Sequence, residues 1–325
     1  MLFEIKDLQV EYSVPGGIAE AVNKASLNVA EGESLGLAGE SGCGKTTLGN
    51  AILRILPGGG QITGGRIDLN GVDLVKLREE EMRQVRWRDI SMIFQGAMNS
   101  FDPTMIIENQ IAEGILIHQR GTSKETALKR TRELLGLCEI SPLLGKRYPH
   151  ELSGGMKQRA CIAMALALQP KLLIADEITT ALDVMTQAQI FTLLRDMRRK
   201  FSLSMIIVSH DLTVLAKNCD RLAIMYAGHI VEVGTIEDIF EHPQHPYVKG
   251  LLFCIPSFAG DREIIAAIKG APPSLLDPPR GCPFHPRCPI SIPECEVEVP
   301  QLVSVNTNNH SVACYRKDYK GDIWK

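Results

Sequence analysis

Nine residues, Gly39–Thr47, read GESGCGKTT and combine three glycines, a lysine and two threonines directly after the apolar run Ser34–Ala38. A glycine-rich turn between a strand and a helix points backbone N–H groups and the positive end of the helix at one spot. Such a spot suits phosphate, and G-x-x-x-x-G-K-T is the pattern of a Walker A loop. The sequence therefore predicts a site for a nucleoside triphosphate. An ordinary glycine-rich turn is the alternative.

Single residues of this loop have distinct predicted roles. Lys45 is long enough to reach the outer phosphates, and the hydroxyl of Thr46 is a ligand for Mg²⁺. The nucleotide contacts expected from the loop are Gly39, Ser41, Gly42, Cys43, Gly44, Lys45, Thr46 and Thr47.

Two acids follow a second apolar run. The run Lys171–Ala175 is typical of a buried strand, and it delivers Asp176 and Glu177 to its carboxyl end, where ligands bind in open α/β sheets. In phosphate-loop hydrolases, one such acid binds Mg²⁺ through water and the other orients or deprotonates the attacking water. We therefore expect Asp176 at the metal and Glu177 as the catalytic residue. An acidic pair that caps the following turn is the alternative.

A third motif, LSGGMKQR, occupies residues 152–159 and directly precedes a helical pattern. Ser153 is expected to cap the helix, and Gly154 and Gly155 would expose its first amides. These features predict a second anion site at a helix N-terminus. Taken alone, the motif indicates no more than an ordinary capped helix, which is the default interpretation.

Hydrophobic spacing predicts the elements that position these motifs. The expected strands are 3–10, 25–29, 34–38, 66–69, 90–94, 171–175, 205–208, 222–226 and 229–233. The expected helices are 125–137, 155–168 and 184–200. Two buried strands separated by the last of these helices are the βαβ pattern of a parallel sheet, so the predicted fold class is α/β.

Size and charge narrow the function. The 325 residues, 45% of them hydrophobic, allow one large α/β domain and a smaller appendage. With 35 basic and 38 acidic residues, the net charge of −3 predicts no broad basic surface for nucleic acid. No apolar run approaches the roughly 18–20 residues that cross a bilayer, and the start MLFEIKDLQV has no cleavage signal. We therefore expect a cytosolic chain that can dock on a membrane protein.

Nine cysteines are unevenly spread along the chain. Five are isolated and are expected to be mostly small buried side chains: Cys43, Cys138, Cys161, Cys219 and Cys254. The other four crowd a proline-rich tail with five, six and eighteen residues between them: Cys282, Cys288, Cys295 and Cys314. Four thiolates can close one metal site, and the lack of C-x-x-C pairs favours an iron–sulfur cluster, with zinc as the alternative. Four free thiols in a disordered tail are a third interpretation, and disulfides are not expected in a cytosolic protein.

Taken together and in order, the motifs of residues 1–233 resemble the nucleotide-binding subunit of an ATP-binding-cassette (ABC) transporter. They are GESGCGKTT, Gln95 in IFQGAMNS, LSGGMKQR, LLIADE, Asp183 in TTALD and His210 in IIVSHD. The resemblance implies a P-loop ABC cassette in residues 1–234, with a parallel-sheet core, an antiparallel β subdomain and a helical subdomain at about residues 96–155. It also implies ATP and Mg²⁺ as ligands.

The resemblance implies roles for residues outside the loop. Gln95 would contact Mg²⁺, together with Thr46 and Asp176, and sense the γ-phosphate. His210 would contact the γ-phosphate beside Glu177.

Three further positions complete this comparison. Asp183 is implied to lie at a dimer interface. Tyr12 looks like the aromatic residue that stacks on adenine, with simple packing on a strand as the alternative. Many family members have proline after the catalytic glutamate, where this chain has Ile178. Because both acids are kept, we expect activity to be retained.

Subunits of this family pair head to tail. ATP on one Walker A loop would then be capped by the partner's signature segment, represented here by Ser153, Gly154, Gly155 and Gln158. Nucleotide would favour the closed dimer, and hydrolysis would remove the charge that bridges it. The implied partner is a second, similar ATPase in a heterodimer, with a homodimer as the alternative. The helical stretch between Gln95 and Ser153 would contact two integral-membrane permease subunits.

The tail resembles one subfamily. HPQHPYVKGLL, GAPPSLLDPPRGCPFHPRCP and the last two cysteines are similar to the ATPases of dipeptide/oligopeptide importers, including the D-type subunit with a C-terminal [4Fe-4S] cluster. Residues 235–325 are thus expected to form a C-terminal extension in which Cys282, Cys288, Cys295 and Cys314 hold the cluster. With four cysteines at hand, His285 and His310 are expected to be solvated or packed.

The resemblance implies an ATPase that powers the import of peptides and lies peripherally on the cytoplasmic face of the cell membrane. An extracytoplasmic solute-binding protein would be a further partner. Nickel or oligosaccharide import is the nearest alternative, because the same subfamily carries these solutes. A soluble ABC-type ATPase that acts on nucleic acid or in translation is the alternative from another class.

Overall fold

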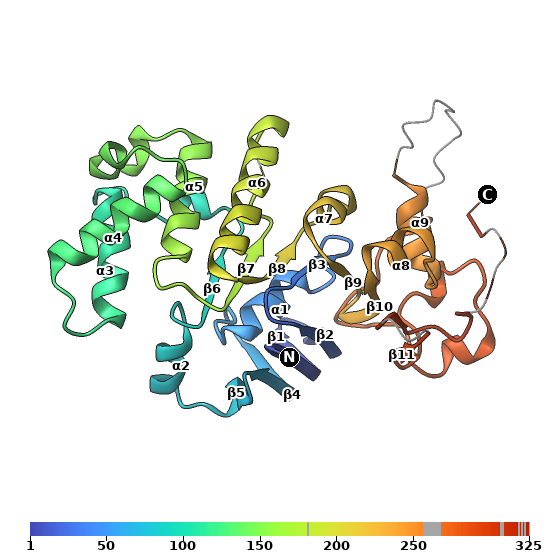
Figure 1. The fold of residues 1–325 in the computed structure, drawn as a ribbon. Helices are drawn as coiled ribbons and strands as arrows, with labels where there is room; N and C mark the ends of the chain where they lie inside the picture. Colours follow the sequence, from blue (N-terminus) through green and yellow to red (C-terminus); the bar gives the residue numbers. More distant parts are fainter. Residues whose placement is uncertain are drawn as a thin grey trace. The chain divides into compact units, whose positions relative to one another are not determined.

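The structure is a computed structural model that describes residues 1–180, 182–255, 268–305, 309–317, 319, 321 and 323–324 (Figure 1). The chain forms two compact units. Unit 1 comprises Met1–Val29, Leu35–Val75 and Ser209–Lys325, and unit 2 comprises Ala30–Ser34 and Lys76–Val208.

Unit 1 begins with an antiparallel sheet of strand order β2-β1-β4-β5. Its strands are β1 (Phe3–Val14), β2 (Gly17–Val29), β4 (Gly60–Leu69) and β5 (Val72–Asp73). Apolar residues of β1 alternate with exposed ones and are buried, which puts one face of the sheet in the core. At Asp7, with φ of 48°, the register shifts and the alternation skips a residue.

A second group of strands in unit 1 leads to the Walker A loop. β3 (Ser34–Ala38) pairs in parallel with β9 (Arg221–Tyr226), which forms a hairpin with β10 (His229–Thr235). Ala227 and Gly228 both have positive φ, as a tight hairpin turn requires. β12 (Ser311–Val312) and β11 (Val303–Ser304) extend this group, so the C-terminal tail adds strands beside β10.

The helices of unit 1 are short. They are α1 (Lys45–Ile52), α7 (Leu212–Asn218), α8 (Ile236–Glu241) and α9 (Pro246–Phe253). Two 3-10 turns follow in the tail, η5 (His285–Arg287) and η6 (Pro293–Glu296). Proline at the first position of α9 costs no hydrogen bond, because that N–H has no partner within a helix.

Unit 2 contains three parallel strands in the order β8-β7-β6. They are β6 (Ile90–Ile93), β7 (Leu172–Asp176) and β8 (Ser204–Val208), and every residue of β7 and β8 is buried. The helix α6 (Val184–Phe201) connects β7 to β8. This confirms the βαβ pattern predicted from the sequence.

The remaining elements of unit 2 are helical, and two of them match the helices predicted at residues 125–137 and 155–168. The helices are α2 (Glu79–Val85), α3 (Ile107–His118), α4 (Lys124–Leu137) and α5 (Gly154–Ala165). Short 3-10 turns are η1 (Leu74–Lys76), η2 (Ala97–Asn99), η3 (Pro142–Lys146) and η4 (Pro149–Glu151). α4 packs against both α3 and α5 (Figure 1).

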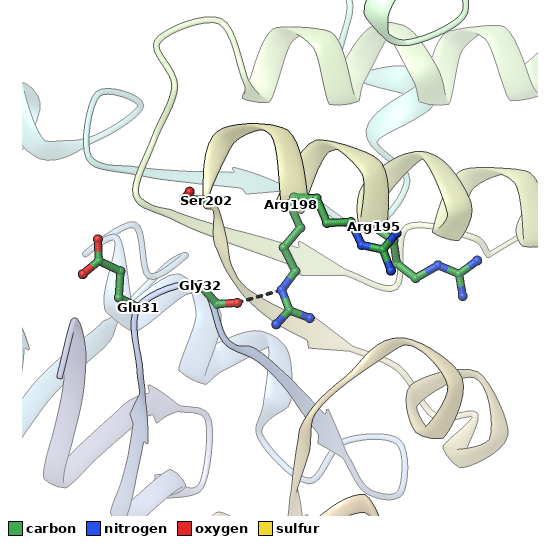
Figure 2. A pocket seen from close by; sticks show the side chains of 6 residues that line it. Glu31, Gly32, Arg195, Arg198 and Ser202 are labelled. Carbon is green, nitrogen blue, oxygen red and sulfur yellow. Dashed lines mark hydrogen bonds between the residues drawn. The ribbon is translucent and has the colours of Figure 1, made fainter.

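A basic hollow lies at the end of α6 (Figure 2). Arg195, Arg198 and Arg199 line it, and the Nε of Arg198 donates a hydrogen bond to the carbonyl oxygen of Gly32 at 2.8 Å. Basic side chains in the last turn of a helix offset the negative end of its dipole. Arg198 and Arg199, which lie in the last turn of α6, therefore have a structural explanation.

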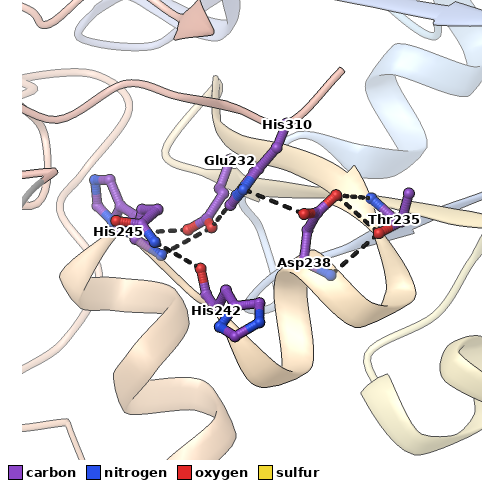
Figure 3. Close-up of polar contacts among 7 residues, drawn as sticks. Glu232, Thr235, Asp238, His242, His245 and His310 are labelled. Atoms are coloured by element: carbon purple, nitrogen blue, oxygen red, sulfur yellow. Dashed lines mark hydrogen bonds and ion pairs between the residues drawn. The ribbon is translucent and has the colours of Figure 1, made fainter. Parts of the chain in front are cut away.

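A buried polar network within unit 1 joins β10 to the C-terminal tail (Figure 3). The carboxylate of Glu232 on β10 accepts hydrogen bonds from the backbone N–H groups of Gln244 (2.9 Å) and His245 (2.7 Å). The Nε2 atom of His310 lies 2.8 Å from the same carboxylate, and its Nδ1 lies 3.7 Å from Asp238. Because Glu232 and His310 are 0% and 1% exposed, these contacts replace the water that both groups lose on folding.

Replacing His310 by alanine should destabilise unit 1. His310→Ala would leave the buried Glu232 carboxylate with one partner fewer, so we expect the free energy of unfolding to fall by about 3 kcal/mol. Urea unfolding of the two proteins measures this. The matched control is His242→Ala, because His242 is exposed. Equal stability of His310→Ala and His242→Ala would contradict a stabilising role of the network.

Candidate functional site

The Walker A loop joins two elements that fix its ends. All five residues of β3 are buried, and α1 begins at Lys45 directly after Gly44. Gly44 adopts φ of 108°, and its carbonyl oxygen accepts the first helical hydrogen bond from Leu48 at 2.8 Å. The strand, glycine loop and helix predicted from the sequence are therefore confirmed.

Two glycines of the loop are required by backbone conformation and by space. Gly39 has φ of 152°, and a Cβ atom there would lie 2.1 Å from the carbonyl oxygen of Met225. At Gly44 a Cβ atom would lie 2.2 Å from the carbonyl oxygen of Ala21. No other residue type fits either position without moving backbone.

Lys45 lies inside the loop and is only 6% exposed. Its Nζ atom donates to the carbonyl oxygens of Gly39 at 2.8 Å and Glu40 at 2.9 Å. Burial raises the pKa of Cys43, against the opposing effect of Lys45, so Cys43 remains a thiol. The loop therefore holds a positive charge where its backbone curves around it, which is an arrangement suited to phosphate.

The other predicted nucleotide contacts of unit 1 vary in exposure. Ser41, Gly42 and Thr46 are exposed, and Thr47 is half-buried. Tyr12 on β1 is half-buried, and a Cβ atom on Gly60 would lie 2.6 Å from its ring, so the ring covers the neighbouring strand. The adenine contact of Tyr12 stays a prediction. His210 is exposed just before α7, and Asp211 caps that helix by accepting from the N–H of Thr213 at 2.8 Å.

Unit 2 brings Gln95 and Glu177 together from positions 82 residues apart in the sequence. The Nε2 of Gln95 donates to the Oε2 of Glu177 at 3.1 Å. Glu177 has φ of 46°, an uncommon conformation for a residue with a side chain, and Thr180 donates to its carbonyl oxygen at 2.9 Å. Asp176 ends β7 and is 1% exposed. The two acids therefore stand at the carboxyl end of a buried strand.

Ile178, which directly follows the predicted catalytic glutamate, is 4% exposed. An apolar side chain at this position is thus accommodated in the core. The contact between Gln95 and Glu177 is formed with isoleucine present.

The signature segment and the residues around Asp183 also meet in unit 2. Ser153 caps α5 by accepting from the N–H of Met156 at 3.3 Å, and Asp183 caps α6 by accepting from that of Thr186 at 2.9 Å. A Cβ atom on Gly155 would lie 3.0 Å from Thr186. The hydrogen bonds with Thr186 are the main cause of the lowered pKa of Asp183, so this carboxylate is charged at neutral pH.

The predicted signature residues differ in accessibility. Ser153 and Gly154 are exposed, whereas Gln158 is only 1% exposed. A nucleotide contact from a partner would therefore reach Ser153 directly, and it would reach Gln158 only after a rearrangement. The roles of Ser153, Gly154, Gly155, Gln158 and Asp183 stay predictions. So does the assembly of Lys45 and His210 with Asp176 and Glu177 around one nucleotide, because these pairs belong to different units.

The four cysteines of the tail line one small cavity in unit 1. Burial raises the pKa of Cys282 to about 12 and that of Cys314 to about 11, so these thiols are protonated at neutral pH. The cavity holds about 10 Å³, roughly the space for one water-sized sphere. In the described parts of the chain, no group of three or more His, Cys, Asp and Glu residues is arranged to hold a metal ion. The predicted cysteine-ligated metal module is thus unsupported, although its four cysteines line the same cavity.

The two histidines expected to stay outside this site have other contacts. His310 belongs to the Glu232 network, as expected for a packed residue. The Nδ1 of His285 lies 2.9 Å from the carbonyl oxygen of Cys282.

Sequence patterns missed two residues that touch the Walker A loop. Arg287 forms an ion pair with Glu40, and the hydroxyl of Tyr247 accepts a hydrogen bond from the N–H of Glu40 at 3.0 Å. Glu40 lies 247 and 207 positions from these residues, and no local spacing rule joins segments so distant. The sequence signal at Tyr247 is the HPY triplet, His245–Tyr247, which carries the resemblance to the peptide-importer ATPases.

The class of protein follows from the loop. A buried strand, a glycine turn with left-handed backbone and a helix that begins at an inward-facing lysine define a P-loop nucleoside triphosphatase.

Comparisons with known proteins specify the family. Residues 22–180 match the ABC transporter family, and residues 231–295 match the oligopeptide/dipeptide transporter C-terminal region. A dipeptide transport ATP-binding protein, DppD of Bacillus subtilis, is 42% identical over 99% of this chain and 96% of its own length. An oligopeptide transport ATP-binding protein, OppD of Haemophilus influenzae, is 44% identical over 94% of each chain. The chain belongs to the ABC transporter ATP-binding proteins, in the branch of the oligopeptide and dipeptide transporters.

A solved structure agrees with this assignment. The dimeric ATP-binding cassette MJ0796, bound to ADP and Pi, matches with a TM-score of 0.65 and 28% identity, over 72% of this chain and 99% of that one. The chain is therefore an ABC-type ATPase with the P-loop cassette fold. None of its described helices is both long and apolar enough to span a membrane.

Replacing Glu177 by glutamine should block hydrolysis and leave nucleotide binding intact. Glu177→Gln keeps the size of the side chain and removes the base, so we expect kcat for MgATP to fall by roughly 10²–10⁴-fold. Phosphate release by the purified protein, beside ATP binding, measures the two effects. Glu133→Gln is the matched control, because Glu133 is exposed on α4. Turnover of Glu177→Gln at the rate of the control would reject the catalytic role of Glu177.

Proposed function

We propose that this chain hydrolyses ATP to power the import of dipeptides or oligopeptides through a membrane transporter. The observation that carries the proposal is the similarity to peptide-transport ATP-binding proteins over nearly the whole chain, including the C-terminal region. The chain would act at the cytoplasmic face of the membrane, on two permease subunits that receive solute from an extracytoplasmic binding protein.

ATP would act by favouring one arrangement of two cassettes over another. The triphosphate would bind at Lys45 and the loop amides, with Mg²⁺ held by Thr46, Gln95 and Asp176. The partner's signature segment would complete the site, so that closure depends on nucleotide. The dimeric state of the similar cassette MJ0796 supports pairing, and the proposed partner is a second, similar ATPase.

In the closed state, Glu177 would orient or deprotonate the attacking water. The hydrogen bond from Gln95 supports this role, because it holds the Glu177 carboxylate in one orientation. His210 would bind the γ-phosphate. Once the product phosphate leaves, this contact would be lost and the dimer could reopen.

We also propose that the four tail cysteines hold a [4Fe-4S] cluster, with Zn²⁺ as the alternative. The support for this proposal is that all four cysteines line one cavity and that none of the residues described around it is a carboxylate. The raised pKa values mean that metal must displace the thiol protons, so loading would be favoured at higher pH. A cluster when bound would supply cross-links between segments of the tail that contain little regular structure.

Solute uptake tests the transport proposal. Vesicles that contain this chain together with its permease subunits and binding protein should take up a labelled tripeptide only with ATP. Lys45→Ala should reduce uptake to background, because the loop loses the charge that faces phosphate. Lys6→Ala, at an exposed position on β1, is the control.

Two other results would contradict the proposal. If the vesicles took up labelled nickel or an oligosaccharide but no peptide, the transported solute would be nickel or the oligosaccharide. If the protein purified with nucleic acid and without membrane subunits, a soluble ATPase would be favoured instead.

Metal analysis tests the cysteine site. Protein purified without oxygen should be brown and contain four irons and four sulfides per chain, and Cys288→Ser should lose the visible absorption. Cys254→Ser is the control, because Cys254 does not line the cavity. A colourless protein with one zinc would establish the alternative, and a protein free of both metals would contradict a metal site.

A further inference from the structure

Arg287, in the turn η5 of the tail, uses all its donors within the protein. Its Nη1 and Nη2 atoms donate to the two carboxylate oxygens of Glu40 at 2.8 and 3.1 Å. Nη1 also donates to the hydroxyl of Tyr226 at 3.1 Å, and Nε and Nη2 donate to the carbonyl oxygens of Lys269 and Ile268 at 3.1 and 3.4 Å. Such a bidentate ion pair fixes the orientation of the two side chains as well as the distance between them.

Glu40 is the second residue of the Walker A loop and is held on three sides. Its carboxylate pairs with Arg287, and its N–H donates to Tyr247 at 3.0 Å. Its carbonyl oxygen accepts from the Nζ atom of Lys45 at 2.9 Å. One residue thus connects the tail to the lysine that faces phosphate.

Aromatic rings shield these contacts from water. The ring centroids of Tyr226 and Tyr247 lie 4.6 Å apart, and Phe284 lies 5.3 and 5.4 Å from them. The side chain of Arg287 is 7% exposed and that of Glu40 is 23% exposed. Because the surroundings are poor in water, the pair is stronger and more directional than one on the surface.

We propose that the C-terminal tail positions the nucleotide-binding loop, with Arg287 and Tyr247 as positioning residues that act on Lys45 through Glu40. By fixing the backbone of Glu40, the tail would hold the loop in its phosphate-binding shape before ATP arrives, which lowers the cost of ordering it on binding. The proposal rests on the loop being the ATP site of this ABC ATPase and is independent of the transported solute.

Two simpler explanations make different predictions. If the pair only attaches the tail, its loss lowers stability without changing nucleotide affinity. If the pair only balances charge near the phosphates, Arg287→Gln weakens ATP binding, because it leaves a carboxylate, whereas Glu40→Gln strengthens it, because it leaves a cation. If the pair positions the loop, both Arg287→Gln and Glu40→Gln should bind ATP more weakly.

The test measures MgATP dissociation constants of the full chain with the variants Arg287→Gln, Glu40→Gln and the double variant. We expect each single variant to weaken binding about tenfold and to raise KM for ATP by a similar factor, with a smaller change in kcat. The double variant should bind no more weakly than either single one, because both remove the same contact. Arg280→Gln, an exposed arginine of the tail, is the matched control.

Tyr247→Phe keeps the aromatic packing and removes only the acceptor for the Glu40 N–H, so it remains informative if Arg287→Gln folds poorly. It should also weaken MgATP binding. Dissociation constants of Tyr247→Phe and Arg287→Gln within twofold of the control, or opposite shifts in Glu40→Gln and Arg287→Gln, would overturn the proposal. Additive losses in the double variant would overturn it as well.

Discussion

The ammonium group of Lys45, held by the carbonyl oxygens of Gly39 and Glu40, is the interaction on which the rest of the ATP site depends. A buried positive charge surrounded by backbone needs polar partners, and the glycine turn supplies them because a Cβ atom at Gly39 or Gly44 would clash with backbone oxygens. The buried strand β3 and the helix α1 fix the two ends of this loop. Phosphate is the natural ligand of such a charge.

The C-terminal tail acts on the same loop. Arg287 and Tyr247 contact Glu40 from sequence positions more than 200 residues away. The carboxylate of Glu232 on β10 also joins the tail through His245 and His310. Arg287 directly precedes Cys288, one of the cysteines around the small cavity. The segment around Arg287 and Cys288 therefore joins the tail to the nucleotide-binding loop, and a metal bound at the cysteines would also order this segment.

Much of this was predictable from the sequence, because the chemistry is local. The glycine spacing predicted the loop, and buried apolar runs predicted β3, β7 and β8 to within a residue. The strands β1, β2 and β4 are longer than predicted, because their ends lie in an exposed hairpin region where apolar alternation is lost. The contacts of Arg287 and Tyr247 with Glu40 were not predictable, since they depend on the packing of distant segments. The four cysteines were found by spacing, but spacing gave no information on whether their side chains are arranged for a metal.

The most direct measurement is a structure of the assembled transporter with a non-hydrolysable ATP analogue. The account predicts the γ-phosphate within hydrogen-bond distance of the Nζ atom of Lys45, with Glu177 beside it and the partner's signature segment on its other side. A nucleotide bound away from Lys45, or closed by no partner segment, would contradict the account.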